Sequence, residues 1–345
     1  MGLLNHETNY FGLDIGSSAI RLVQLRGSGG KPVLVTYGDV KVPGGLTSSD
    51  AAGDRDKIAD LVKQLIRDTR VGTKNVVAGL SSANVFASVI TMPKLSNADI
   101  DKAIKYQADQ YIPMPLDEVK VDWSLLGPGA NDQEIEVLLV AAPIMATDKY
   151  LDILEKSGLE IVALEANATA VARALMPVSD IAVVILDVGS HASDLTIVYK
   201  NSPRLIRSIG IGAGTFVKAV AQNLNLNDEQ AQQFTYRFGL TQSKLEGQVN
   251  KAIAPNVDVL VSEITKSIKF FAERYPQVKI EKLIVTGQGI AIPEYTNYMA
   301  NSTGLPVEVG NSWINISYPA SNQEKLLSVS SEYAVAAGLA QRTLV

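Results

Sequence analysis

Two stretches about half the chain apart share six residues at the same positions. Residues 13–25 read LDIGSSAIRLVQL and residues 186–198 read LDVGSHASDLTIV, so that Leu, Asp, Gly, Ser, Ala and Leu coincide in register. Such self-similarity across half of a 345-residue chain indicates two related lobes. We therefore expect each lobe to present an equivalent hairpin, with an aspartate at its turn, to a cleft that the lobes share.

The turn within each stretch suits the binding of a phosphate together with a divalent cation. In the first, two β-type runs flank the sequence DIGSS, in which we expect Gly16 to take a positive φ. Successive backbone N–H groups of such a turn point at one spot and can cradle an anion. Mg²⁺ is typically held by one or two carboxylates together with substrate phosphates, so we predict that Asp14 and Asp187 orient waters around Mg²⁺. The turn residues predicted to offer N–H groups to phosphate oxygens are Gly16, Ser17, Ser18, Gly189 and Ser190. For each of them an ordinary tight turn is the alternative.

The composition excludes several classes of protein. The chain has no cysteine and only two histidines, far apart in sequence, which argues against thiolate chemistry, a zinc cluster and a Ser-His-Asp hydrolase. The net charge is −5 and there is no basic block, so nucleic-acid binding is not expected. Residues 1–9 lack the features of a secretory signal, and the longest apolar run, residues 181–186, is too short to span a bilayer. We expect a cytoplasmic protein that does not itself insert into a membrane.

Three further segments, together with the two hairpins, resemble the ATPases of the actin, heat-shock chaperone and sugar kinase superfamily. Residues 164–170 (LEANATA) are similar to the segment that crosses between the lobes, and residues 285–290 (VTGQGI) to the glycine-rich adenosine loop. Residues 333–340 (YAVAAGLA) are similar to a second connecting helix, in which small residues let helices approach closely. The resemblance implies an α/β, actin-like two-lobed ATPase fold of duplicated ribonuclease H-like lobes, with ATP and Mg²⁺ bound between them.

The resemblance also implies roles for individual residues. Glu165 would orient an attacking or metal-bound water, or else serve as a partner for the helix that follows it. Arg21 matches a position that is often lysine in the superfamily, and either contacts phosphate or lies solvated on its strand. His191 replaces the usual glycine or threonine, and either touches the γ-phosphate or is exposed in its loop. The residues implied to lie against adenosine are Gly212, Gly214, Gly287, Gln288 and Gly289.

One departure from the superfamily pattern concerns a helix of the second lobe. Related proteins usually carry an acidic residue, followed three residues later by lysine, which contact the ribose and the base. Here the corresponding run is AQQFT at residues 231–235, which contains neither. The departure bears on nucleotide affinity rather than on the fold. Separately, we expect weak or no ATPase activity, because phosphoryl transfer needs a positioned water and only Glu165 and His191 are available to position it.

An insertion in the first lobe indicates the branch of the superfamily. Residues 81–159 read as a compact β/α module, in which Ser96 caps a helix that ends before the two prolines of IPMP at residues 112–115. The string IDKAIKYQADQYIPMPLDEVKVDWSLL is very similar to the pattern of the type IV pilus assembly PilM family, which carries this kind of module as FtsA does.

The expected organisation follows from these segments. The first lobe comprises residues 1–80 and 160–180, the module residues 81–159, and the second lobe residues 181–345. Within the second lobe we expect a smaller subdomain at about 225–280, with a helix over 257–275. A C-terminal helix at 332–342 is expected to pack back at the junction of the lobes.

The resemblance to the PilM family further implies a protein partner. In that reading, a groove between the module and the first lobe holds the short N-terminal cytoplasmic tail of PilN, a bitopic membrane protein, which would place this chain at the periphery of the inner membrane. Aromatic and methionine side chains next to the Pro-x-Pro segment are typical of protein-binding surfaces. The residues predicted to contact the partner are Tyr106, Tyr111, Ile112, Met114 and Leu116. Sealing the module's own core is the alternative for each of them.

The function that this resemblance implies is a cytoplasmic ATP-binding scaffold of type IV pilus assembly. Other pilus assembly components and self-association are further candidates for its interactions. Two other functions stay open, a small-molecule kinase of the same superfamily and an FtsA-like filament-forming cytoskeletal protein. A kinase needs an aspartate within hydrogen-bond reach of the acceptor hydroxyl, and no aspartate stands out in such a motif.

Overall fold

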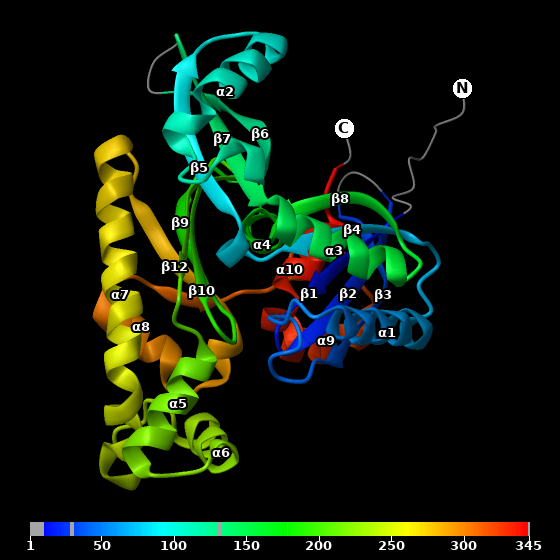
Figure 1. Ribbon diagram of the computed structural model, residues 1–345. Helices are drawn as coiled ribbons and strands as arrows, with labels where there is room; N and C mark the ends of the chain where they lie inside the picture. Colours follow the sequence, from blue (N-terminus) through cyan, green and yellow to red (C-terminus); the bar gives the residue numbers. More distant parts are fainter. Residues whose placement is uncertain (1–9, 28–30, 130–132, 178, 344–345) are drawn as a thin grey trace.

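The computed structural model describes residues 10–27, 31–129, 133–177 and 179–343. The expected absence of a secretory signal concerns residues 1–9, which lie outside this description. The described chain forms two lobes, each built on a five-stranded mixed sheet, and a smaller module with a three-stranded sheet (Figure 1).

The first lobe has the sheet order β3-β2-β1-β4-β8. Strands β1 to β3 form an antiparallel meander. Strand β4 pairs with β1 in parallel, and β8 pairs with β4 in parallel. Helix α1 packs on one face through Ile58, Val62 and Leu65, which recur at helical spacing. The strands are β1 (Phe11–Ile15), β2 (Ala19–Arg26), β3 (Val33–Lys41), β4 (Asn75–Leu80) and β8 (Glu160–Ala166). The helices are α1 (Ala52–Thr69), α4 (Asn167–Leu175), α9 (Gln323–Val329) and α10 (Ala334–Ala340).

The second lobe repeats this topology, with the sheet order β11-β10-β9-β12-β13. Its first three strands are again an antiparallel meander, and the last two add in parallel, so the duplication predicted from the repeat is confirmed. The strands are β9 (Ala182–Val188), β10 (Ser193–Tyr199), β11 (Ser202–Ile209), β12 (Ile280–Gly287) and β13 (Val307–Val309). The helices are α5 (Ala213–Leu224), α6 (Asp228–Phe238), α7 (Gln248–Arg274) and α8 (Tyr295–Thr303). Short 3₁₀ turns elsewhere are η1 (Ser82–Asn84), η2 (Leu116–Glu118), η3 (Leu245–Gly247), η4 (Gln288–Ala291), η5 (Ala320–Asn322) and η6 (Ser330–Glu332).

Helix α7 is longer than the sequence predicted. The expected start at Val257 is wrong, because the helix begins at Gln248 and contains Pro255. A proline removes one backbone donor and disfavours the helix interior. Here the turns before it bury Val249 and Ile253 in the core of the second lobe, and this apolar packing holds them helical.

The inserted module has a core of its own. Its strands β5 (Phe86–Pro93), β6 (Val119–Pro128) and β7 (Glu134–Pro143) form a sheet in the order β5-β7-β6, covered by α2 (Asn97–Tyr111). The predicted cap is confirmed, since the Ser96 hydroxyl accepts a hydrogen bond from the Asp99 N–H at 3.3 Å.

The helix that follows the module packs elsewhere. In α3 (Ile144–Lys156), Ile153 and Leu154 lie in the core of the first lobe together with Ile58 and Val62 of α1. The sequence had placed α3 in the module at residues 81–159. We propose that the module ends at Pro143, and the other domain boundaries stay predictions.

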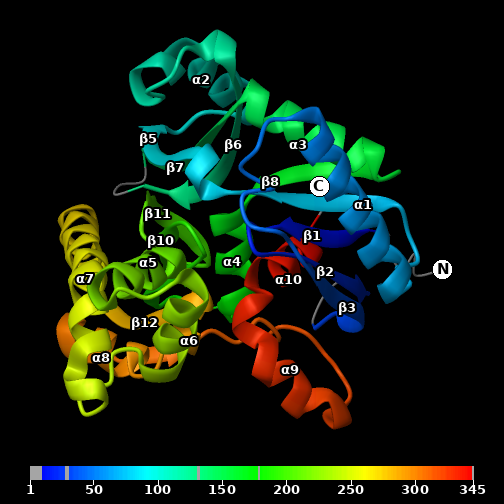
Figure 2. The ribbon, with the colours of Figure 1, turned by 60° about the horizontal axis from the view of Figure 1, so that its bottom comes forward.

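A layer of two helices lies between the two large sheets (Figures 1 and 2). Helix α10 packs on β1, β2 and β4, whereas α4 packs on β10 and β11, and the two helices contact each other. The two helices lie so close together that a Cβ atom at Gly338 would be 1.8 Å from the carbonyl oxygen of Ala170. A Cβ atom at Gly12 would likewise lie 2.3 Å from the carbonyl oxygen of Ala336. The small-residue helix expected at 332–342 corresponds to α10, with bounds of Ala334–Ala340.

Replacing Gly338 by alanine tests this contact. The added methyl group meets backbone rather than a flexible side chain, so we expect the free energy of unfolding to fall by about 1–3 kcal/mol. Gly53 of α1 is the matched control, because a Cβ atom there meets nothing within 4 Å. Gly53→Ala should leave stability unchanged or raise it by up to about 1 kcal/mol. Urea unfolding measures both, and equal effects of the two substitutions would contradict the close contact.

Candidate functional site

The two repeated hairpins form equivalent turns. The Gly16 N–H donates a hydrogen bond to the Ala19 carbonyl at 3.1 Å, and the Gly189 N–H donates to the Ala192 carbonyl at 3.0 Å. Asp14 stands at the end of β1 and Asp187 near the end of β9, in the same position relative to each turn. The repeat in the sequence is thus a repeat of backbone hydrogen bonding.

The glycine of each turn is required for a reason other than the expected one. The prediction of a positive φ at Gly16 is wrong, because the described glycines with positive φ do not include it. A Cβ atom at Gly16 would lie 2.8 Å from the Ala19 carbonyl oxygen, and one at Gly189 would lie 2.9 Å from that of Ala192. Glycine is therefore needed because a larger residue would clash with the carbonyl oxygen that closes each turn.

The two aspartates lie close enough to influence each other. Burial raises the pKa of the Asp14 carboxyl to about 6, although the nearby Arg21 guanidinium opposes the rise. Burial also raises the pKa of Asp187 to about 7, with further increases from the charges of Asp194 and Asp14. Buried carboxylates that repel one another favour either a proton or a cation between them.

This pair of carboxylates suits a cation that brings ligands of its own. Within the described segments, no group of three or more His, Cys, Asp or Glu side chains is arranged to hold a metal ion by itself. A cation bound by Asp14 and Asp187 must therefore complete its coordination with waters or with oxygens of a bound anion. That combination is the one in which Mg²⁺ usually binds beside nucleotide phosphates.

Asp194 is a site residue that the sequence prediction missed. It lies directly across from Asp187 on β10, in the position that Arg21 occupies across from Asp14 in the first hairpin. Burial raises the pKa of the Asp194 carboxyl, and its Oδ1 atom has no hydrogen-bond partner among the described residues. Comparison of the two repeats position by position would have found it, since Arg21 and Asp194 occupy the same place in the alignment.

The predicted adenosine loop contacts the second hairpin and reaches the first. Gly287 has a φ of 80°, and a Cβ atom there would lie 2.5 Å from Oδ1 of Asp187. A Cβ atom at Gly289 would lie 2.6 Å from Cγ1 of Val188. The side-chain amide of Gln288 donates a hydrogen bond to the Ser18 hydroxyl, and this bond joins the second lobe to the turn of the first.

Gly212 and Gly214 lie against the second turn as well. The Ala213 N–H donates to the Gly189 carbonyl at 2.9 Å, and the Gly214 N–H donates to the Ser190 carbonyl at 2.8 Å. The start of α5 therefore supports the turn with its first N–H groups. Contact of these two glycines with adenosine stays a prediction.

Arg21 is buried, so the alternative of a solvated strand residue is wrong. Its guanidinium pairs with Glu332 and lies 5.8 Å from the centre of the Tyr333 ring. Its Nε–H is buried and has no hydrogen-bond partner among the described residues. His191 is exposed in its loop, while Ser17 and Ser190 are half-buried.

Glu165 is held by two arginines. It lies on β8 across from Gly79 of β4, and it is buried. Arg173 of α4 donates to both of its carboxylate oxygens, and Arg342 pairs with Oε2 at 3.0 Å. The pairing with Arg173 makes Glu165 a partner of the helix that follows it. Orientation of a water by Glu165 stays a prediction, and it would require this carboxylate to exchange an arginine for the water.

The residues predicted to bind a partner lie on the module, away from the hairpins (Figure 1). Tyr106 is 85% exposed, and Tyr111 and Leu116 are 37% and 38% exposed. Ile112, in contrast, is only 4% exposed and belongs to the module's core, and Met114 packs against that core. The core-sealing alternative therefore describes Ile112 better than a contact surface does.

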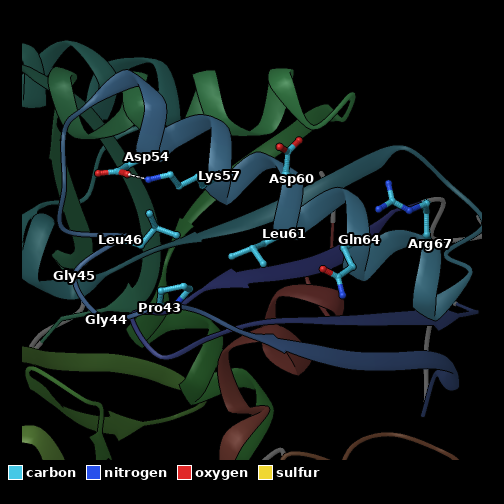
Figure 3. Close-up of a pocket in the computed structure, with 10 residues that line it drawn as sticks. All are labelled: Pro43, Gly44, Gly45, Leu46, Asp54, Lys57, Asp60, Leu61, Gln64 and Arg67. Carbon is cyan, nitrogen blue, oxygen red and sulfur yellow. Dashed lines mark hydrogen bonds and ion pairs between the residues drawn. The ribbon is translucent and has the colours of Figure 1, made fainter.

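A separate groove of about 800 Å³ runs along α1 in the first lobe (Figure 3). One side is formed by the loop after β3, including Pro43 and Leu46, and the other by Lys57, Leu61 and Gln64 of α1. Its lining comes from the first lobe alone and includes none of the predicted nucleotide or partner residues. It is therefore distinct from the predicted groove between the module and the first lobe.

Comparison with known proteins gives a family match and several structural matches. The family model described as type IV pilus assembly protein PilM matches residues 12–344. Among solved structures, a chain of a PilM–PilN type IV pilus biogenesis complex is 26% identical, with a TM-score of 0.82 over 96% of this chain and 97% of that one.

Two more distant structures are similar in fold alone. The ethanolamine utilization protein EutJ from Carboxydothermus hydrogenoformans is 14% identical, with a TM-score of 0.53 over 96% of this chain and 88% of that one. MreB5 of Spiroplasma citri bound to ADP is 13% identical, with a TM-score of 0.51 over 95% and 94% of the two chains. These matches confirm the predicted two-lobed actin-like ATPase fold.

The raised pKa of Asp187 predicts how stability depends on pH in the absence of metal and nucleotide. The folded state binds this proton more tightly than the unfolded chain, whose carboxyl pKa is 3.8 against about 7 in the fold. This contribution to stability is therefore complete below pH 4 and is lost as the pH rises through 7. We expect the loss to be on the order of 2–4 kcal/mol, since one pKa unit corresponds to about 1.4 kcal/mol.

Asp187→Asn should remove most of this loss, so that the variant gains stability relative to the wild type between pH 4 and pH 8. Unfolding in EDTA at a series of pH values measures the difference. Asp60→Asn, which alters an exposed carboxylate on α1, serves as the control. Parallel stability curves for the wild type and Asp187→Asn would contradict the environment described for Asp187.

Proposed function

Because this chain belongs to the type IV pilus assembly protein PilM family, we propose that it is a scaffold of type IV pilus assembly that binds the cytoplasmic tail of a PilN-like inner-membrane protein. The observation that carries this proposal is the match in fold and sequence, over almost the whole of both chains, to a chain of a PilM–PilN complex. The family match favours this scaffold over a small-molecule kinase or a filament-forming protein.

The proposed partner also determines where the protein acts. No helix in the described part of the chain has both the length and the apolar character needed to cross a bilayer. Attachment to the tail of a bitopic protein would hold the chain at the cytoplasmic face of the inner membrane.

The face that we propose for this tail is centred on Tyr111 and Leu116. Helix α2 ends at Tyr111, and the chain then passes through two prolines into the 3₁₀ turn that begins at Leu116. The prolines fix the backbone, so the two exposed side chains are positioned before a partner arrives. Burial of Ile112 in the core beneath them anchors the same segment.

We further propose that the cleft between the lobes binds ATP with Mg²⁺. Three features support this: the paired carboxylates of Asp14 and Asp187, the unpartnered Nε–H of Arg21, and the glycine-rich loop at Gly287. In such a site Mg²⁺ neutralises phosphate charge. Asp14 and Asp187 would hold its waters, and Arg21 would donate to a phosphate oxygen.

The geometry around Glu165 fits a protein that binds ATP and turns it over slowly or not at all. Phosphoryl transfer to water needs a group that orients the water as well as charge neutralisation. By family resemblance, Glu165 is the carboxylate that would orient the water. It already pairs with Arg173 and Arg342.

A synthetic peptide of the PilN-like tail tests the scaffold function. We expect it to bind the full chain with or without ATP, because the Pro-x-Pro segment is preformed. Replacing Tyr111 or Leu116 by aspartate should weaken binding at least about tenfold, since a charge would have to be desolvated in the contact. Both side chains are partly exposed, so the thermal melting temperature should change little.

Leu327→Asp provides the control, because Leu327 is similarly exposed but lies on α9, outside the inserted module. Fluorescence anisotropy of the labelled peptide gives the affinities. Normal binding by the Tyr111 and Leu116 variants, or failure of the wild type to bind, would count against the proposed face and partner.

Calorimetry with ATP tests the cleft. Asp14→Ala and Asp187→Ala should each weaken binding of ATP with Mg²⁺ by about 10- to 100-fold, because each removes a carboxylate that orients the cation's waters. In EDTA the same substitutions should not weaken ATP binding, since they remove negative charge near the triphosphate. Asp60→Ala, on exposed α1, is the control. Undiminished affinity in both variants with Mg²⁺ would contradict the two-hairpin site.

A further inference from the structure

A buried carboxylate joins the inserted module to the second lobe. Glu136 lies on β7, the central strand of the module's sheet, and its side chain is 4% exposed. Its partners all belong to the second lobe, namely Arg204 of β11, Arg274 at the end of α7, and Tyr275 directly after it. These four residues are called the Glu136 network below.

Both oxygens of the Glu136 carboxylate are used. Nη1 of Arg204 donates to Oε2 at 2.6 Å. Nε of Arg274 donates to Oε1 at 3.1 Å, and the hydroxyl of Tyr275 donates to the same oxygen at 2.6 Å. The carboxylate is thus satisfied entirely by groups that reach across from the other lobe.

The arginines also bind the backbone and side chains of the module. Arg204 donates to the Leu126 carbonyl at 3.3 Å. Arg274 donates to the Val89 carbonyl at 2.9 Å and to the Thr91 hydroxyl at 2.7 Å. The contacts therefore involve all three strands of the module's sheet. In Figure 2, β11 lies next to β5 and β7, where these contacts are made.

Breaking the Glu136 network would expose charges that are buried in this structure. The side chain of Arg204 is 3% exposed, so separating it from Glu136 would leave a buried charge unpaired until water entered. Small sliding motions are therefore unfavourable, and the module is either seated on the second lobe or released from it with its charges hydrated.

The position of the network links it to both proposed binding sites. Arg204 lies on β11, in the same sheet as β9, which carries Asp187. Glu136 lies in the same small module as Tyr111 and Leu116. The lobes also meet at the α4–α10 layer and through the Gln288–Ser18 hydrogen bond, and a rotation of the second lobe about that layer would displace Arg204 and Arg274 from Glu136.

We propose that the Glu136 network is a lock between the module and the second lobe, and that it couples occupancy of the partner-binding face to occupancy of the nucleotide cleft. The coupling rests on the proposed function, whereas the lock does not. Linkage requires the effect to be reciprocal, so that nucleotide changes peptide affinity by the same factor as peptide changes nucleotide affinity.

The lock is tested by a distance between spin labels on the module and the second lobe. The chain has no cysteine, so Lys102→Cys and Lys266→Cys, at exposed positions on α2 and α7, give two specific labelling sites. We expect a narrow distance distribution in the otherwise unaltered chain, and a broader or shifted one when Glu136→Gln is added.

Two further variants guard against a simple loss of folding. Arg274→Gln and Thr91→Val remove outer parts of the network and should broaden the distribution to a smaller extent. Glu308→Gln is the control, because it removes a surface ion pair with Lys282 inside the second lobe. An unchanged distribution in folded Glu136→Gln and Arg274→Gln proteins would overturn the lock.

The coupling is tested by titrating the labelled tail peptide with and without ATP and Mg²⁺. In the wild type we expect the peptide affinity to change by about fivefold or more on adding nucleotide, and in Glu136→Gln we expect no change. An equal nucleotide effect in both proteins, or none in the wild type, would overturn the coupling. Failure of the wild type to bind either ligand would contradict the proposed function instead, and the label distances would still decide whether the lock exists.

Discussion

The fold depends on one contact between two short helices made of small residues. Helices α4 and α10 separate the two large sheets, and they can do so in a single layer only because Gly338 lets the backbone of α10 rest against the carbonyl of Ala170. The apolar core around them draws side chains from both lobes, including Val77 of β4 and Ile185 of β9. Hydrophobic burial across this layer makes the two lobes one folded unit.

The same layer positions the candidate site. The sheets that flank it carry Asp14 near the end of β1 and Asp187 near the end of β9, within electrostatic reach of each other. The layer also accounts for the state of Glu165, because Arg173 belongs to α4 and Arg342 follows α10. A carboxylate at the edge of the cleft is thereby used to hold the connecting helices in place.

Much of the fold could be predicted from the sequence because the duplication, the strand patterns and the cap at Ser96 are local or repeated signals. The turns of α7 before Val257 were missed because they are held by burial of Val249 and Ile253, which depends on distant parts of the chain. The attachment of α3 to the first lobe was missed for the same reason. Within the site, residue identities identified Asp14 and Asp187, whereas the pairing of Glu165 and the burial of the Asp194 Oδ1 atom without a partner among the described residues depend on three-dimensional neighbours.

The two hairpins have equivalent backbone hydrogen bonds, but one pair of equivalent side chains differs in charge. Across from its aspartate, the first hairpin carries Arg21 and the second carries Asp194. A duplicated fold has an approximate two-fold symmetry. The difference in charge between Arg21 and Asp194 breaks that symmetry between the two hairpins. In the first hairpin the Asp14 carboxylate faces a guanidinium that also pairs with Glu332, whereas in the second hairpin two carboxylates face each other. A cation is therefore drawn to the second hairpin rather than to the first, before any shape-specific contact forms.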